Sequence, residues 1–285
     1  MKKVAVLGST GMAGHVIALY LEEHGYDVYR ASRSQETNRK SISLDISDFF
    51  LAERWLDQIN PDIVVNCIGL LQRASQEQPN RAVLINSYMP HWLESKYAAS
   101  ETRVIHISTD CVFSGKRGEY KENDFQDGDT MYDRSKALGE INNDKDLTLR
   151  MSIIGPDIDP AGTGLFNWFM KQSGMVGGYT KVIWNGITTI ELSRGIDKAI
   201  SKGLKGLYQL VPQEPIDKYS LLCLFQSIFN KNDVVITKNE IVVSNKSLLN
   251  TRKDFDYTVK GYREQIEDLK IWIVNHKKLY PHYVI

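Results

Sequence analysis

The sequence predicts an α/β fold in which a doubly wound parallel sheet carries a smaller, discontinuous lobe toward the C-terminus. Two observations favour this fold. Short apolar runs alternate with segments of helical spacing as far as Arg150, as they do in parallel sheets with crossover helices. A glycine-rich turn also separates the first apolar run from the first helical segment. Together they predict a Rossmann-like domain over residues 1–150.

Five short apolar runs are predicted to be the strands of this sheet. They are mostly bounded by glycine or polar residues, which is typical of buried parallel strands. The predicted strands are Val4–Leu7, Tyr26–Arg30, Asp62–Ile68, Arg103–Ser108 and Leu147–Arg150.

The segments between these runs carry apolar residues at helical spacing. Gly25 is expected to end the first helix and Asn60-Pro61 the second, while Pro90 is expected to kink the third. The predicted helices are Met12–His24, Phe49–Ile59, about Gln78–Ser100, and Met131–Asn142.

Residues 151–285 are predicted to form mainly a substrate-binding lobe over the carboxyl ends of the strands, where ligands of such sheets bind. Gly155–Gly164 is expected to be a loop, and a strand near 207–211 is expected to return to the main sheet. The other predicted elements are helices at Leu165–Gln172, Thr188–Lys202, Lys218–Phe229 and Tyr262–Lys277, and a short strand at Val234–Thr237.

Composition excludes several classes of partner. The 285 residues include 35 basic and 35 acidic side chains, so a net charge of zero gives no basis for binding nucleic acid or an anionic membrane. No apolar run approaches the length of a bilayer span. Cys67, Cys111 and Cys223 lack metal-ligand spacing, as do the six histidines, so we expect free thiols in a reducing cytoplasm and no metal site.

The glycine-rich turn predicts a dinucleotide site. Gly8 would permit a tight turn, Gly11 would let the backbone approach a pyrophosphate, and Gly14 would allow close helix–strand packing. The N-terminus of the following helix would offer free N–H groups to the phosphates. The predicted contacts in this turn are Gly8, Ser9, Thr10, Gly11, Met12, Ala13 and Gly14.

The residues after the second strand bear on the choice of cofactor. An acidic residue there binds the ribose of NAD, whereas a basic residue accommodates the extra phosphate of NADP. The sequence has Arg30 and Arg33 and no acid, which favours NADPH, with Arg33 as the phosphate contact and NADH as the alternative. Further predicted cofactor contacts are Asp45, Ile46, Cys67, Ile68, Gly69, Ser108, Tyr132 and Lys136.

Tyr132 and Lys136 are four residues apart, so a helix would place them on the same face. A lysine there can hold a nearby phenol in a more acidic state and still reach a ribose hydroxyl. Thr109 ends the fourth strand a short way upstream. Hydride addition to a ketone creates an alkoxide, which a proton-donating phenol stabilises. These residues predict an oxidoreductase.

The same residues resemble the extended short-chain dehydrogenase/reductase superfamily. Within it, residues 108–115, which read STDCVFSG, are similar to the S-T-D-Y-V-F-x-G stretch of dTDP-4-dehydrorhamnose reductases. Residues 150–155 and 184–189 also resemble segments of that group. The resemblance implies reduction of the 4-keto group of a nucleotide-linked 4-keto-6-deoxyhexose, a UDP or dTDP sugar with or without an acetamido group at carbon 2. It also implies a homodimer.

The resemblance implies roles for individual residues. Tyr132 would donate a proton to the oxygen at carbon 4, Lys136 would lower the pKa of Tyr132 and hold the nicotinamide ribose, and Thr109 would hydrogen-bond the same oxygen. Candidate contacts for the sugar or the diphosphate are Gln72, Trp168, Trp184 and Arg252.

Cys111 departs from this pattern, because the simple reductases usually have Tyr there. Its position resembles that of the acid/base Cys of bifunctional 3-epimerase/4-reductases, whose later Lys resembles Lys171 in spacing. The resemblance therefore implies epimerisation at carbon 3 before reduction. The alternative for Cys111 is packing as a small apolar residue.

Two other classes of function stay open at this stage. A 4-epimerase or a dehydratase would recycle tightly bound NAD on the same scaffold, although a dehydratase would need an acid after Asp110 where the sequence has Cys111. A non-catalytic regulatory protein would use the fold only to bind a nucleotide, and the Thr109, Tyr132 and Lys136 set argues against it.

Overall fold

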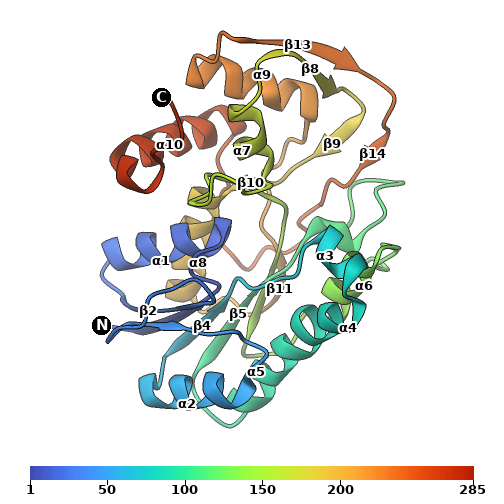
Figure 1. Ribbon diagram of the computed structural model, residues 1–285. Helices are drawn as coiled ribbons and strands as arrows, with labels where there is room; N and C mark the ends of the chain where they lie inside the picture. The colour runs from blue at the N-terminus through green and yellow to red at the C-terminus, as the bar shows by residue number, and fades with distance from the viewer.

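The centre of the molecule is a seven-stranded parallel sheet (Figure 1), and the computed structural model describes all residues, 1–285. The strand order reverses between β1 and β4, and the crevice at such a point is where these sheets bind ligands. From one edge to the other the strands are β11 (Gly206–Gln209), β6 (Leu147–Arg150), β5 (Arg103–Ile107), β4 (Ile63–Asn66), β1 (Lys3–Leu7), β2 (Asp27–Ser32) and β3 (Ser41–Ser43).

Side chains of β1 alternate between two buried faces of the sheet. Val4 and Val6 pack in a cluster with α1 (Met12–Glu23) and α8 (Thr189–Lys202), whereas Ala5 packs with α2 (Phe49–Ile59) and α5 (Met89–Tyr97) on the other face. Both faces of a central parallel strand are apolar because helices cover both of them. The predicted doubly wound fold is confirmed.

The segment predicted as a helix from about Gln78 to Ser100 is helical from Pro79 to Tyr97, with a π-helical segment in its middle. It consists of α4 (Pro79–Ala82), a π-helical segment (Val83–Tyr88) and α5, preceded by a separate α3 (Gln72–Glu77). Pro90, in the first turn of α5, has no N–H to donate to the preceding turn, which is a known cause of such irregularity. The helix predicted to reach Asn142 also ends early, since α6 spans Met131–Leu138.

The rest of the chain builds a lobe around a second core, drawn at the top of Figure 1. Aromatic side chains dominate this core, where Phe166 packs against Phe225, Phe229 and Tyr283. Its helices are α7 (Leu165–Met170), α9 (Lys218–Phe229) and α10 (Tyr262–Asn275). Its strands are β8 (Gly174–Tyr179) with β13 (Val234–Asn239), β9 (Val182–Trp184) with β12 (Ile216–Asp217) and β14 (Ser244–Asn245), and β7 (Ile153–Ile154) with β10 (Ile187–Thr188).

Two details of the lobe bear on the site. β11 pairs with β6 in parallel, so the segment expected near 207–211 does return to the main sheet. In the three-stranded sheet of the lobe, Trp184 on β9 pairs with Ile216 of β12, and the side chain of Lys218, which follows β12, lies against the Trp184 ring. No helix combines the length and the apolar character that crossing a membrane requires.

Candidate active site

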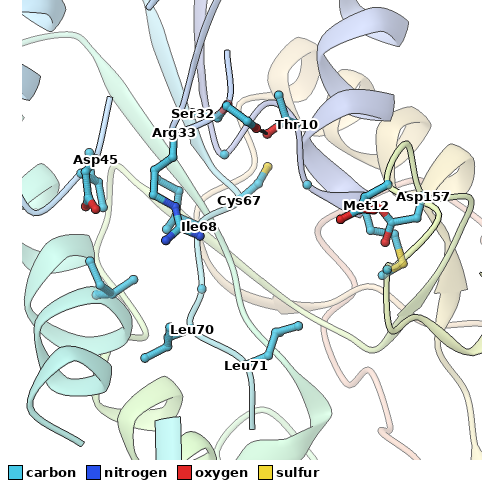
Figure 2. Close-up of a pocket in the computed structure, with 18 of the residues that line it drawn as sticks. Thr10, Met12, Ser32, Arg33, Asp45, Cys67, Ile68, Leu70, Leu71 and Asp157 are labelled. Carbon is cyan, nitrogen blue, oxygen red and sulfur yellow. Dashed lines mark hydrogen bonds between the residues drawn. The ribbon is translucent and has the colours of Figure 1, made fainter. Parts of the chain in front are cut away.

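A groove of about 660 Å³ opens where the strand order reverses (Figure 2). Its walls come from the loops after β1, β2 and β4, and from residues 157–164 of the lobe. Ten residues predicted to contact the cofactor line it: Gly8, Thr10, Gly11, Met12, Arg33, Asp45, Ile46, Cys67, Ile68 and Gly69. The groove therefore has the location and the lining that a dinucleotide requires.

The glycines of the first turn are required by close contacts. Gly8 has φ +82°, and a Cβ on it would lie 3.2 Å from the backbone of Cys67. A Cβ on Gly14 would lie 2.1 Å from the carbonyl oxygen of Gly8, so α1 approaches the turn as closely as backbone can. The free N–H groups at the start of α1 then face the groove, which fits a pyrophosphate.

Two arginines line the end of the groove near β2. Arg33 is one of them, whereas Arg30 pairs with Glu22 on α1 outside the groove. The second is Arg81 on α4, whose Nη2 lies 2.8 Å from Asp45 Oδ2. The sequence-based prediction missed Arg81, because it lies on a helix remote from the motif and carries no local signal.

Thr109 and Tyr132 lie together at the carboxyl end of β5. A capping box between Thr130 and Asp133 starts α6, and it sets Tyr132 in the first turn. The Thr109 hydroxyl is close enough to hydrogen-bond the phenol, which favours ionisation. Burial nevertheless raises the pKa of Tyr132 above its ordinary value, and Cys111 adds to this rise. The phenol is therefore protonated at neutral pH and available as a proton donor.

Lys136 is buried one turn further along α6. Its Nζ donates a hydrogen bond to the carbonyl oxygen of Ile107 at 2.7 Å and lies 3.2 Å from His106 Nε2. Burial lowers the pKa of Lys136 to about 8. Burial is the largest cause of the raised pKa of Tyr132, and the lowering by Lys136 that the sequence implies stays a prediction.

Cys111 lies beside Tyr132 and Gln72, whose Nε2 is 3.8 Å from the sulfur. Burial, and next the carboxyl group of Asp110, raise the pKa of the Cys111 thiol to about 12. The thiol is therefore protonated. Gln72 is thus brought to the reactive residues, as a substrate contact would be.

Lys171 is not brought to Cys111, which corrects the pairing implied by the resemblance. Its ammonium group donates to the carbonyl oxygen of Pro160 in the loop beside the cofactor groove. α7 ends at Met170, so Lys171 caps that helix and turns toward this loop. Trp168, on the same helix, is 39% exposed, and its contact with the sugar stays a prediction.

Two other lysines flank Cys111 instead. Lys246, which follows β14, lies within hydrogen-bonding reach of the thiol. Burial lowers the pKa of Lys246, but Cys111 and Asp110 together outweigh this, so the pKa is raised. Lys218, at the start of α9, has its Nζ 4.0 Å from the centroid of the buried Trp184 ring. Burial lowers the pKa of Lys218 to about 8, although Asp110 and Cys111 oppose the change.

Two further predicted contacts are corrected by the structure. Arg252 donates to the carbonyl oxygens of Lys205 and Leu207 and pairs with Asp254, so it clamps the edge strand β11. Ser108 donates to Glu140 Oε1 at 2.6 Å, away from the cofactor groove. Both side chains have structural partners, which a local sequence pattern does not reveal. Ser9, Ala13 and Gly14 support the turn without lining the groove.

Comparisons with known proteins identify relatives by sequence and by fold. The structure of dTDP-4-dehydrorhamnose reductase from Bacillus anthracis, in complex with NADP, matches with a TM-score of 0.81 at 19% identity, over 95% of this chain and 99% of that one. This likeness shows a shared fold. The dTDP-4-dehydrorhamnose reductase of Mycolicibacterium smegmatis is 30% identical over 142 residues, which are 49% of this chain and 40% of that protein.

A relative with a different name matches more of the chain at lower identity. The methionine adenosyltransferase 2 subunit beta of Xenopus tropicalis is 22% identical over 243 residues, which are 80% of this chain and 72% of that protein. The chain spans about half of the length of the curated relatives that it matches at 30–32% identity.

The family model for the RmlD substrate binding domain matches residues 1–154. This match contains the glycine turn, the Thr109 strand end and the helix that carries Tyr132 and Lys136. It covers more than half of the 285 residues. The chain therefore belongs to the RmlD substrate binding domain family, among the extended short-chain dehydrogenase/reductases.

Proposed function

We propose that the protein reduces the 4-keto group of a nucleotide-linked 4-keto-6-deoxyhexose, with NADPH as the reductant. The observation that carries this proposal is the meeting of Thr109, Tyr132 and Cys111 at the end of β5, beside a groove built for a dinucleotide. Both reductase relatives described above carry the name dTDP-4-dehydrorhamnose reductase, which supports the substrate class.

The cofactor would be held by the glycine turn and the two arginines. NADPH, when bound, supplies the hydride. Gly8, Gly11 and the start of α1 would face its pyrophosphate, while Arg33 and Arg81 would neutralise its additional phosphate. The solved B. anthracis reductase contains NADP, which supports this choice.

Tyr132 would donate its proton to the oxygen at carbon 4. Because burial keeps the phenol protonated, the proton is in place when the alkoxide develops, and Thr109 would hold that oxygen by a hydrogen bond. The phenolate that remains would be reprotonated from solvent. General acid catalysis of this kind typically accounts for about 10²–10⁴-fold in rate.

Epimerisation at carbon 3 is the finer part of the proposal, and it involves Lys218 in place of Lys171. The hydrogen at carbon 3 is acidified by the neighbouring ketone. Lys218, with a pKa of about 8, has a neutral fraction that can remove this proton and leave an enolate on carbons 3 and 4. The protonated Cys111 thiol would return a proton to the opposite face. Lys246 would stabilise the resulting thiolate.

The proposal is tested by supplying the protein with UDP- and dTDP-linked 4-keto-6-deoxy sugars and NADPH, and following the products by NMR. We expect a 4-hydroxy product and a higher kcat/KM with NADPH than with NADH. If neither sugar is reduced, the proposal fails. If NADH is clearly preferred, the role given to Arg33 and Arg81 fails.

A regulatory protein is the competing proposal from another class, and the methionine adenosyltransferase subunit relative favours it. It predicts nucleotide binding without turnover, so the same assay separates the two. A 4-epimerase or dehydratase would release NAD from the purified protein on denaturation, and we expect no stoichiometric NAD.

We also propose a division of labour between the two parts of the chain. Residues 1–150, with β11, would bind the cofactor, and residues 151–285 would mainly bind the substrate. The homodimer and the cytoplasmic location stay predictions from the sequence, and light scattering at micromolar concentration tests the first.

A further inference from the structure

A buried chain of polar side chains leads away from Lys136, and the reaction proposed above does not use it. Asn66 on β4 and His106 on β5 are paired across adjacent strands, and neither is exposed to solvent. Asn66 Nδ2 lies 3.0 Å from His106 Nδ1, and His106 Nε2 lies 3.2 Å from Lys136 Nζ. Buried polar groups must find their partners within the protein, so each of these contacts needs one donor and one acceptor.

The backbone determines the orientation of the Asn66 amide. The N–H of Ile68 donates to Asn66 Oδ1 at 3.1 Å. Turning the amide over would set its NH₂ against that N–H and leave a backbone donor unpaired, which costs about 1–3 kcal/mol. Asn66 Nδ2 therefore faces His106. Because an amide nitrogen only donates, His106 Nδ1 must accept.

This arrangement places the proton of His106 on Nε2. Burial holds the pKa of His106 well below its ordinary value, so the ring is neutral and carries one proton. With Nδ1 accepting, the N–H is on Nε2 and points at Lys136 Nζ. An ammonium group has no lone pair and cannot accept it, whereas a neutral amine can. The amine still donates to the carbonyl oxygen of Ile107.

None of the charged and titratable groups around Lys136 requires it to be in the ammonium form. Glu140 favours the ammonium form, but Arg150 Nε donates to Glu140 Oε1 at 2.9 Å and neutralises it. Cys67 also faces Lys136, and burial raises the pKa of its thiol to about 12, so it is uncharged. Tyr132 is a protonated phenol, and the two ring nitrogens of His91 contact Glu94 and the carbonyl oxygen of Leu138.

We propose that Asn66 and His106 stabilise the neutral amine form of Lys136 in the cofactor-free protein, and that cofactor binding shifts Lys136 to the ammonium form by uptake of a proton from solvent. The phosphates of a dinucleotide bring negative charge, and its ribose oxygens offer acceptors, which both favour the ammonium form. Asn66 and His106 are positioning residues in this scheme. The first half concerns the free protein alone, whereas the second half rests on the proposed function.

Nitrogen NMR of the free protein with ¹⁵N-labelled histidine tests the first half. We expect the His106 proton on Nε2, and a proton on Nδ1 in the wild type overturns the proposal. Asn66→Asp supplies a carboxylate that accepts at the same place, so this variant should move the proton to Nδ1. The wild-type spectrum decides the question even if the variant does not fold.

Carbon NMR of labelled lysine measures the charge of Lys136 directly. Its signal is assigned by its absence in Lys136→Met, and we expect it to titrate near the pKa of about 8. A midpoint at the ordinary lysine value of about 10.4 would show that the neutral amine is not stabilised and would refute the proposal.

Calorimetry tests the second half through proton uptake. NADPH is titrated into the protein at pH ~8.5 in two buffers of different ionisation enthalpy. At this pH we expect Lys136 to take up about 0.8 proton when NADPH binds. Lys136→Met should take up none. Equal heats in both buffers overturn the coupling, whereas failure to bind NADPH removes the proposed function and the second half together. The NMR result on the free protein is independent of either outcome.

Discussion

The reactive residues are set apart by protonation states that burial imposes on them. Tyr132 and Cys111 are both held protonated, since burial raises the pKa of each, whereas burial lowers the pKa of Lys218 to about 8. Tyr132 and Cys111 can therefore act as acids and Lys218 as a base beside the same site. Groups whose pKa values are pushed apart in this way are suited to give and take protons in one reaction.

We expect Tyr132→Phe to lose reduction by about 10²–10⁴-fold, because only the proton donor is removed. Binding of NADPH, measured by fluorescence titration, should change little, since the groove is lined by other residues. Turnover near the wild-type rate would remove Tyr132 from the mechanism.

Cys111→Ser should separate the two proposed activities. Without NADPH, the wild type should exchange the carbon 3 hydrogen of a 4-keto sugar for deuterium from solvent, as NMR can follow. We expect the variant to lose this exchange by about 100-fold or more while reducing a ketone already in the final configuration, because Thr109 and Tyr132 are unchanged.

Matched lysine variants sharpen this test. Lys218→Met should lose exchange in the same way, whereas Lys171→Met should keep it, because Lys171 binds the Pro160 carbonyl instead. No exchange by the wild type above the spontaneous rate would refute the epimerase. Joint loss of exchange and reduction in Cys111→Ser would mean that the sulfur only shapes the shared site.

At the scale of elements, one turn and one small sheet assemble the site. The turn between β1 and α1 forms the cofactor groove, and the sheet of β9, β12 and β14 presents Trp184, Lys218 and Lys246 to the end of β5. The first is a local feature of the chain. The sheet joins three segments that are far apart along the chain from one another and from Cys111.

Gly14→Ala should disrupt the turn, because its Cβ would lie 2.1 Å from the carbonyl oxygen of Gly8, and backbone cannot yield as a side chain does. We expect a loss of about 1–3 kcal/mol in unfolding free energy, together with weaker NADPH binding. Gly177→Ala is the matched control, since its nearest neighbour is Asn239 at 3.5 Å. Equal denaturant midpoints for both variants would contradict the packing argument.

The contrast between the local turn and the long-range sheet explains how much of the site the sequence could predict. The glycine turn, the strand ends and the Tyr132/Lys136 helix have periodic or motif signals within a few residues, so their prediction needed no tertiary information. Lys218 and Lys246 reach Cys111 only because β12 and β14 pair with β9, and no spacing along the chain records that pairing. The resemblance instead implied Lys171, whose ammonium group donates to the carbonyl oxygen of Pro160.

At the scale of the whole molecule, the two parts are interleaved along the chain. β11 and α8 belong to the main sheet and its covering layer, although both come after the first strands of the lobe. Arg150, fully buried at the end of β6, pairs with Glu140 and ties the strand to the segment after α6. The chain therefore cannot be cut at residue 150 without opening the sheet.

A fragment of residues 1–154, the span of the family match, should not fold by itself. It would leave the edge of β6 unpaired and would expose the apolar face that Leu192, Ile196 and Ala199 of α8 cover. We expect weak near-ultraviolet circular dichroism and aggregation for this fragment. A cooperative thermal transition in it would contradict the interleaved arrangement.

The late position of β11 also has a consequence for synthesis of the protein. When the first 154 residues have emerged from the ribosome, every residue predicted to contact the cofactor is present. The sheet still lacks its seventh strand, β11, and the helix α8 that covers one of its faces. The nascent chain must wait with an open edge until Gln209 has left the exit tunnel. During that interval the unpaired strand edge can associate with other chains, so a chaperone that covers this edge, or faster translation of residues 155–209, would favour correct folding.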